Sequence, residues 1–214
     1  MLKTSKEIEK VRKNIEEMPY LTLHGLAPLG IKKYYLKIIL SRLKKRGEII
    51  SLKRGTYVSL SYLKKTKEKG FYNKYLEFVS SVIYSPSYLS LEYVLNENNI
   101  LTESSFGFSA ISMKKTNHFK NTLGDFYYYS IKKDLFSGFK IERSNDLLVY
   151  KATVGKALFD FLYIRKNIIN GEDFLDSLRV NKEQINKKDL REFKEYAKKE
   201  GSKKMKMISK YYAG

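Results

Sequence analysis

The chain has 214 residues, no cysteine, only two histidines and a formal net charge of +19. The lack of cysteine excludes disulfides and thiolate metal sites, and the length suits one domain or a small domain joined to a medium one. An excess of positive charge of this size predicts a polyanionic partner, with nucleic acid first and an anionic membrane second.

The positive charge is concentrated at the two ends of the chain. Residues 1–65 carry a net charge of +11, residues 66–180 carry +2 and residues 181–214 carry +6. Lys, Asn, Ile and Tyr are all abundant, so drift in an AT-rich coding sequence is an alternative source of the excess. Drift would spread the charge more evenly, so this distribution favours a nucleic-acid partner.

The first third of the chain begins with helical periodicity. Ile8, Val11, Ile15 and Met18 recur at the spacing of one helix face, which predicts a first helix that ends near Met18. A second, short helix is predicted over residues 23–29, although Pro28 strains it.

A third helix is predicted from Ile31, with Gly47 as its C-cap. Its apolar stripe has the spacing i, i+3, i+4, i+7 and consists of Leu36, Ile39, Leu40 and Leu43. The runs "EIISL" and "TYVSL" follow, separated by "KRG", and predict a hairpin in which Gly55 permits the turn. In this hairpin Ile50 and Leu52 are expected to share one strand face.

Three helices followed by a hairpin are the plan of a winged helix-turn-helix, here expected over residues 1–65. Burial of the apolar stripe would turn the opposite, basic face of the third helix outward, and such a helix fits the major groove of B-DNA. Arg54 at the hairpin tip suits a narrow minor groove. The predicted DNA-binding residues are Lys32, Lys33, Tyr34, Tyr35, Lys37, Ser41, Arg42, Lys44, Lys53 and Arg54. A merely solvated face and a protein-interaction module are the alternatives.

The rest of the chain predicts a second domain. The polar segment 61–70 is expected to be a linker, and residues 71–214 an α+β domain with a small antiparallel sheet and C-terminal helices. Short β-like runs carry the sheet: "FGFSAISM", "GDFYYYSI", "SGFKIE" and "DLLVYK". Strict helical spacing returns at Val154 and again in the tail.

Three stretches of this region resemble a known family: "SPSYLSLEYVLNENNIL" (85–101), "FYYYSIKKDLFSGFKIE" (126–142) and "YKATVGKALFDFLYIRKN" (150–167). They are similar to the AbiEi family, the antitoxin and transcriptional regulator of AbiE-type (type IV) toxin–antitoxin systems. The ribbon "GEIISLKRGTYV" is similar as well, so the resemblance spans roughly residues 19–167. Gly155 departs from the pattern, because the family often has an acidic residue before the K-A-L.

The resemblance implies two roles for the chain. Its winged helix would bind double-stranded DNA at inverted repeats upstream of its own operon and repress it. Because each chain has one predicted winged helix, two copies would fit one inverted repeat. Its C-terminal domain would act as antitoxin against a nucleotidyltransferase-like toxin, with no stable complex required, in the setting of abortive infection by phage. The alternative is an antitoxin that acts by direct protein contact or on RNA, with the winged helix as adaptor.

No catalytic, cofactor or metal site is expected. His24 and His118 have no partners at ligand spacing, and "VGKAL" lacks the glycines of a phosphate-binding loop, so Lys156 is expected to face solvent or a partner. Asp160 is interpreted as a buried polar anchor rather than a functional carboxylate. We therefore expect a protein that is not an enzyme.

The tail alternates basic residues with Phe and Tyr over residues 187–212. Three interpretations stay open: contacts to DNA, contacts to an acidic face of the toxin, or a solvated pair of terminal helices. Its apolar stripe is too narrow to favour a membrane surface. No segment has the length of a signal peptide core or of a membrane span, so a cytoplasmic location is expected.

Overall fold

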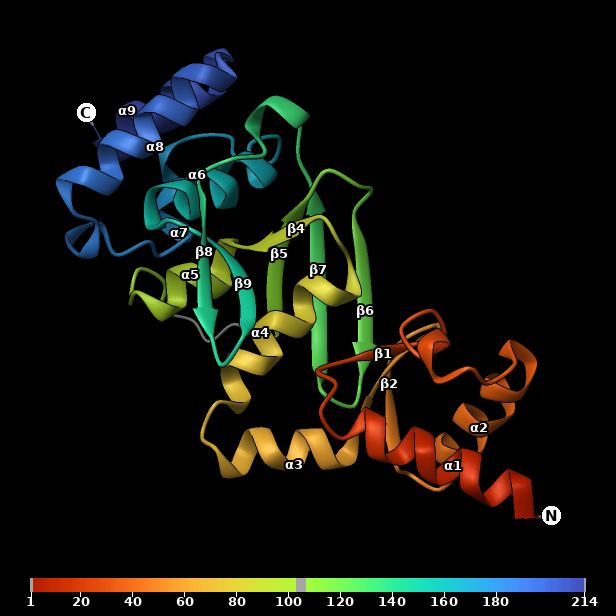
Figure 1. Ribbon diagram of the computed structural model, residues 1–214. Helices are drawn as coiled ribbons and strands as arrows, with labels where there is room; N and C mark the ends of the chain where they lie inside the picture. Colours follow the sequence, from red (N-terminus) through yellow and green to blue (C-terminus); the bar gives the residue numbers. More distant parts are fainter. Residues whose placement is uncertain (1, 103–106, 214) are drawn as a thin grey trace. The chain divides into compact units, whose positions relative to one another are not determined.

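The computed structural model describes residues 2–102 and 107–213, and its fold is mixed α+β (Figure 1). Contacts divide the chain into two compact units. The first comprises Met1–Val79 with Lys120–Leu123, and the second comprises Ser80–Phe119 with Gly124–Gly214. No helix in the described part of the chain is both long and apolar enough to cross a membrane.

The first unit packs helices against a three-stranded antiparallel sheet of order β1-β3-β2. In chain order its elements are α1 (Leu2–Ile15), β1 (Leu21–Thr22), the 3-10 turn η1 (Ala27–Leu29), α2 (Lys33–Lys45), β2 (Ile49–Lys53), β3 (Thr56–Ser59) and α3 (Leu60–Glu68). Helix α4 (Tyr72–Ile83) begins in this unit and ends in the second.

The core of the first unit is aliphatic and joins α1, α2 and the sheet. Its buried residues are Val11, Ile15, Leu21, Leu26, Ile31, Leu36, Ile39, Leu40, Leu43 and Ile49. All four residues of the predicted stripe are therefore buried, which confirms the predicted inner face of this helix. The helix itself begins at Lys33, two residues later than predicted.

The predicted helix over residues 23–29 is wrong. This segment follows the short strand β1, in which Thr22 pairs with Thr56, and then forms a turn that leads into η1. The amide of Gly25 donates to the Thr22 hydroxyl at 3.0 Å, and Gly30, with φ +72°, ends the 3-10 turn. Proline in the first turn of η1 is compatible with so short a helix, because its missing N–H would be unsatisfied there in any case.

The hairpin β2–β3 forms as predicted, but its buried face differs. Ile49 and Leu52 are buried, whereas Ile50 is half-buried. The register shifts between Ser51 and Lys53. This irregularity breaks the two-residue alternation of the strand, so residues three apart face the same side.

The predicted linker at residues 61–70 is also wrong, because most of it belongs to α3. Ser59 caps this helix, and its hydroxyl accepts from the Tyr62 amide at 3.1 Å. Tyr62, Leu63 and Thr66 are buried. A cap and three buried side chains stabilise as helix a segment whose composition is mostly polar.

The second unit is built on a six-stranded sheet of order β6-β7-β5-β4-β9-β8. Its strands are β4 (Ser87–Leu89), β5 (Phe108–Ser112), β6 (Asn117–Asn121), β7 (Gly124–Ser130), β8 (Phe139–Ser144) and β9 (Leu147–Ala152). Its helical segments are α5 (Leu91–Glu97), η2 (Lys133–Leu135), α6 (Val154–Arg165), α7 (Glu172–Ser177), η3 (Lys182–Gln184), α8 (Lys187–Glu200) and α9 (Lys203–Ala213). Figure 1 shows α8 between α6 and α9, and α8 packs against both.

The α+β class is confirmed, but the antiparallel sheet is wrong, because this sheet is mixed. Strands β4 and β5 are antiparallel, as are β8 and β9, whereas β5 pairs with β7 and β4 pairs with β9 in parallel. The chain passes through β6 at the sheet edge before β7, and β4 and β9 are far apart in the sequence. Intervening strands of this kind let two neighbours run in the same direction.

An ion pair ties α1 to the segment between α2 and β2. Arg12 donates from Nε and Nη2 to the two carboxylate oxygens of Glu48, both at 2.7 Å, and also contacts Glu9. The bidentate geometry makes this a strong charge-assisted contact. The hydrogen bonds from Arg12 hold the pKa of Glu48 below its ordinary value of 4.5.

Acid should therefore destabilise the first unit through Glu48. A carboxylate with a lowered folded-state pKa contributes stability above 4.5, and this contribution is lost as pH falls through the folded pKa. We expect Glu48→Gln to lower the thermal unfolding midpoint at neutral pH and to flatten its decline in acid. Glu9→Gln, which removes the more exposed partner of Arg12, should leave that decline nearly as steep as in wild type. Equal acid sensitivity of the Glu48→Gln and wild-type proteins would contradict this assignment.

Candidate nucleic-acid interface

The packing of α2 against the core determines which face of the helix is exposed to solvent. Leu36, Ile39 and Leu43 are each at most 1% exposed, so the opposite face of the helix lies in solvent. Exposed side chains on or beside α2 that the sequence predicted as DNA-binding are Lys32, Lys33, Tyr34, Lys37, Ser41, Arg42 and Lys44. The structure thus brings these predicted residues together on one exposed surface.

Tyr35 differs from its neighbours on the helix. It is half-buried and packs on the core of the first unit, and its hydroxyl finds no hydrogen-bond partner in the described part of the chain. Its ring meets that of Tyr34 edge-on at 6.4 Å. Tyr35 therefore supports the position of α2 and of Tyr34 more than it adds to the outer face.

Two further residues of the outer face of α2 are absent from the residues predicted to bind DNA. Ile38 is 41% exposed although it is aliphatic, and Lys45 is exposed in the last turn. At about 100° per residue, both lie nearly opposite Leu36. The helical periodicity of the sequence could therefore have predicted their exposure. An outward-facing Ile38 is suited to contact with a thymine methyl group.

The first turn of α2 borders an open pocket of about 560 Å³. Its lining residues are Leu23, His24, Ala27, Gly30, Ile31, Lys32, Lys33 and Leu36. Lys32 occupies the N-cap position and makes no side-chain capping bond. An uncapped helix N-terminus beside two lysines attracts anions such as a phosphate group, because amide donors and positive charge converge there.

The hairpin tip presents Arg54 to solvent. Gly55 adopts φ +77°, which a turn of this kind requires, and Arg54 is exposed beside it while Lys53 is half-buried. Within the first unit, the Asn121 side chain donates to the carbonyl of Leu52 at 3.0 Å. This bond holds the strand that leads to the tip, so that Arg54 projects from a braced ribbon.

A buried ion pair forms the most unusual cluster of the second unit. Lys156 and Asp160, one turn apart on α6, are both 0% exposed and are joined by a hydrogen bond. The expectation that Lys156 faces solvent or a partner is therefore wrong. The lysine instead fills a space among aromatic rings, with Phe159 and Tyr196 at 4.7 and 4.8 Å from its ammonium group.

Asp160 is further satisfied by two hydroxyl donors. Tyr88 and Ser90 donate to its second oxygen at 3.1 and 2.8 Å. Burial raises the pKa of Asp160 and lowers that of Lys156, because removal from water penalises both charges. Lys156 and Asp160 have no exposed surface, and Asp160 contacts only buried side chains of the protein. This suits the predicted role of Asp160 as a polar anchor rather than that of a catalytic carboxylate.

The approach of α8 to α6 explains the glycine at position 155. A Cβ atom at Gly155 would lie 2.4 Å from the carbonyl oxygen of Asp189 and 2.9 Å from the Cβ atom of Glu192. The acidic residue that the resemblance leads one to expect here would thus collide with the backbone of α8. Gly155 is a packing requirement of this chain.

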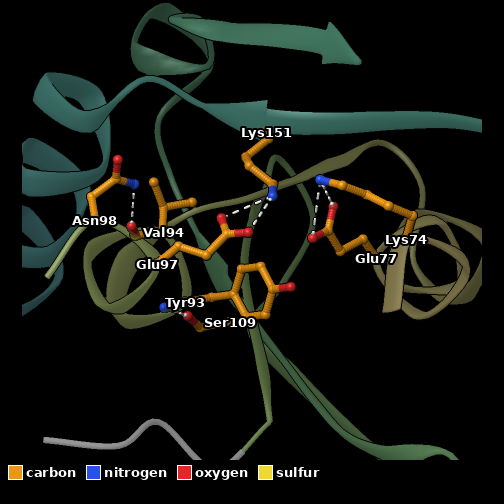
Figure 2. Close-up of polar contacts among 8 residues, drawn as sticks. All are labelled: Lys74, Glu77, Tyr93, Val94, Glu97, Asn98, Ser109 and Lys151. Carbon is orange, nitrogen blue, oxygen red and sulfur yellow. Dashed lines mark hydrogen bonds and ion pairs between the residues drawn. The ribbon is translucent and has the colours of Figure 1, made fainter. Parts of the chain in front are cut away.

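A second ion pair of this unit joins Lys151 and Glu97 (Figure 2), and its carboxylate is partly open to solvent. Lys151 on β9 reaches both carboxylate oxygens of Glu97 at 2.9 and 2.8 Å, and lies 5.5 Å from the centre of the Tyr93 ring. Nearby, the Tyr93 amide donates to the Ser109 hydroxyl. These contacts join α5 to the sheet. In the residues that the structure describes, no group of three or more His, Cys, Asp or Glu side chains could hold a metal ion.

Comparisons with known proteins leave the family open. A scan against protein-family models finds no match, and a search of curated proteins finds no significant relative.

The buried pair can be tested by comparing the stability of a single variant with that of a double variant. Lys156→Met alone leaves a buried carboxylate without its counter-charge, so we expect it to lower the free energy of unfolding by about 3–5 kcal/mol. The double variant Lys156→Met with Asp160→Asn removes both charges and keeps an acceptor for Tyr88 and Ser90. It should be more stable than Lys156→Met alone in chemical denaturation. A double variant that is less stable than the single one would show that the two groups are not paired as charges.

Proposed function

We propose that this chain is a sequence-specific DNA-binding repressor that controls its own toxin–antitoxin operon, with the second unit as antitoxin. The observation that carries the DNA-binding part is the outer face of α2. Four aliphatic side chains are buried on one side of this helix, while lysines, Arg42, Tyr34 and Ser41 are exposed on the rest.

The arrangement of the first unit supports a winged helix-turn-helix. The order α1, β1, η1, α2, β2, β3 and the sheet order β1-β3-β2 match that plan, with the second helix reduced to a 3-10 turn. In this interpretation α2 is the recognition helix and the β2–β3 hairpin is the wing. The recognition helix enters the major groove, and Arg54 contacts the adjacent backbone or minor groove.

The charges of this surface favour DNA over a protein partner. No acidic residue occurs from Ile31 to Gly47, and the exposed side chains are mainly lysines. Lysine is depleted in protein–protein interfaces but supplies phosphate contacts in nucleic-acid complexes. The exposed Ile38 and Ser41 add the apolar and hydrogen-bonding groups with which base edges can be distinguished.

The antitoxin part of the proposal rests on the resemblance of residues 85–101, 126–142 and 150–167 to the AbiEi family. The second unit presents no enzyme-like constellation among its described residues that would favour catalysis instead: Lys156 and Asp160 are buried, and His118 pairs with Asp125 on the surface. A non-catalytic protein that counters a nucleotidyltransferase-like toxin is consistent with this.

Two paired substitutions test DNA binding on duplexes from the region upstream of the reading frame. Lys53→Ala with Arg54→Ala should weaken operator and random duplexes alike and lower the salt dependence by about 0.9 per lost phosphate contact. Lys33→Ala with Lys37→Ala should reduce the preference for the operator by about 1–3 kcal/mol. Lys64→Ala with Lys69→Ala, on α3 and at its end, removes the same charge and should change neither. Wild-type operator preference in the Lys33 and Lys37 variant would refute the role of α2.

The two proposed roles should separate in cells in which the proposed toxin, a nucleotidyltransferase-like protein, is also expressed. The full chain with Lys33→Ala and Lys37→Ala should lose repression of its promoter and still restore growth when the toxin is expressed, because those lysines lie outside the second unit. Wild-type protein provides the positive control. Simultaneous loss of repression and rescue would favour the alternative in which the first unit is an adaptor for toxin neutralisation.

A further inference from the structure

Two rings of the second unit are stacked face to face near one edge of the six-stranded sheet, and we call them the edge stack. His118 on β6 and Tyr127 on β7 have ring planes only 1° apart, with ring centres separated by 4.4 Å. Nε2 of His118 lies 2.8 Å from a carboxylate oxygen of Asp125, which holds the imidazole in this orientation. The side chain of His118 is 45% exposed and Tyr127 is half-buried, so the stack is preorganised and reaches solvent.

The position of β6 leaves one ring face of His118 without a neighbouring strand. The sheet order begins β6-β7-β5, so β6 is an edge strand and Tyr127 lies on the inner side of His118 (Figure 1). Aromatic groups attract one another in stacked arrangements. A planar group that approaches the edge of the sheet can therefore continue the stack on the outer ring face of His118.

The edge stack is on the face of the sheet that α4 does not cover. Along β7 the side chains alternate between the two faces, and the neighbours of Tyr127, which are Phe126 and Tyr128, are at most 1% exposed. The Tyr128 hydroxyl donates to the carbonyl of Ser80 on α4. Tyr127 points to the opposite face, where its ring meets His118.

Exposed lysines flank the edge stack at the end of the ribbon where β6 begins and β7 ends. They are Lys115, Lys132 and Lys133. The Ser130 amide donates to the Thr116 hydroxyl at 3.1 Å, which brings the two strand ends together. Asp125 is the one acidic residue in residues 113–133, and it is paired with His118. Positive charge is therefore gathered beside the two rings.

Rings and cations together indicate a single-stranded nucleic acid, and RNA in particular. Loops and ends of RNA present unstacked bases, which stack on aromatic side chains, histidine included, while lysines hold the phosphates. Duplex DNA covers both faces of each base, so it could use the lysines but not the ring of His118. A neutral sugar could stack on the ring but would leave the lysines unused. A protein partner is disfavoured because lysine is depleted in protein–protein interfaces.

We propose that the edge stack binds an unpaired base of single-stranded RNA. The base stacks on the outer ring face of His118, and the adjacent phosphates contact the flanking lysines. Such a site tolerates different sequences, because every base has a face that can stack. His118 and Tyr127 belong to the second unit, and the proposal does not depend on recognition of an operator by α2.

The test measures binding of a short unstructured RNA to the full chain, beside an abasic RNA of the same length. We expect His118→Ala to weaken binding of the base-carrying RNA about fivefold or more, because it removes the ring on which the base stacks. His118→Phe supplies a ring again and should restore binding. The abasic RNA should bind wild type and His118→Ala equally, because it offers phosphates alone. Tyr150→Ala is the matched control, since it removes a half-buried ring from β9 of the same sheet and should leave RNA binding unchanged.

A salt titration tests the lysines separately. Changing Lys115, Lys132 and Lys133 to Gln should lower the slope of log affinity against log salt by up to about 2, at about 0.7 per phosphate contact of a single strand. A slope equal to that of wild type would contradict the part assigned to these lysines.

Three results would overturn the proposal. The first is wild-type affinity of His118→Ala for the base-carrying RNA. The second is an equal loss on base-carrying and abasic RNA, which would mean that the ring does not stack with a base. The third is a dependence on His118 that is stronger for single-stranded or duplex DNA of the same sequence than for RNA.

Discussion

The rotation of α2 about its own axis is the constraint on which the functional account depends. Leu36, Ile39, Leu40 and Leu43 are buried together with residues of α1 and the sheet. Each such side chain is stabilised by about 1.5–3 kcal/mol on burial, so a helix rotated to hide its lysines would expose all four and desolvate the charges as well. The core thereby determines which side chains α2 presents to a partner, and these are mainly cations.

Two kinds of positive charge serve different purposes in this molecule. Lys156 is buried against Asp160 and three aromatic rings, where its charge is paired with that of the carboxylate inside the second unit. The cations of α2 are exposed, and so are Lys187, Arg191, Lys194 and Lys198 on one side of α8. The net charge of +19 alone cannot distinguish these cases. The burial of each cation and its ion-pair partners distinguish them. The exposed cations lie on defined faces in both units.

Helical periodicity made the inner face of α2 predictable, and the same reasoning gave α6, α8 and α9. It failed where tertiary contacts override local pattern. Residues 23–29 join a strand and a turn because Thr22 pairs with β3, and the polar segment after Ser59 becomes helical because three of its side chains are buried. The bulge at Ser51 and Lys53 shifted the buried face of β2, which no alternation of residue types reveals.

The candidate interface was predictable to a similar extent. The lysines of α2 followed from a helical stripe and its opposite face, yet Ile38 and Lys45 were overlooked although the same geometry places them outward. Tyr35 turned inward because its ring fills space beside the core, a choice that depends on neighbours distant in the sequence. The burial of Lys156 was not predictable, because only Asp160 shares its helix, while its other neighbours come from three separate segments of the chain: Tyr88, Gly138 and Tyr196.

The central claim is that the outer face of α2 lies against duplex DNA, and amine-labelling mass spectrometry tests it most directly. The acylation rates of Lys33, Lys37 and Lys64 would be measured with and without the duplex from the upstream region. The account predicts that the duplex slows labelling of Lys33 and Lys37 several-fold and leaves Lys64, on α3, unchanged. If Lys33 and Lys37 are labelled as fast with a fully bound duplex as without it, the account is contradicted.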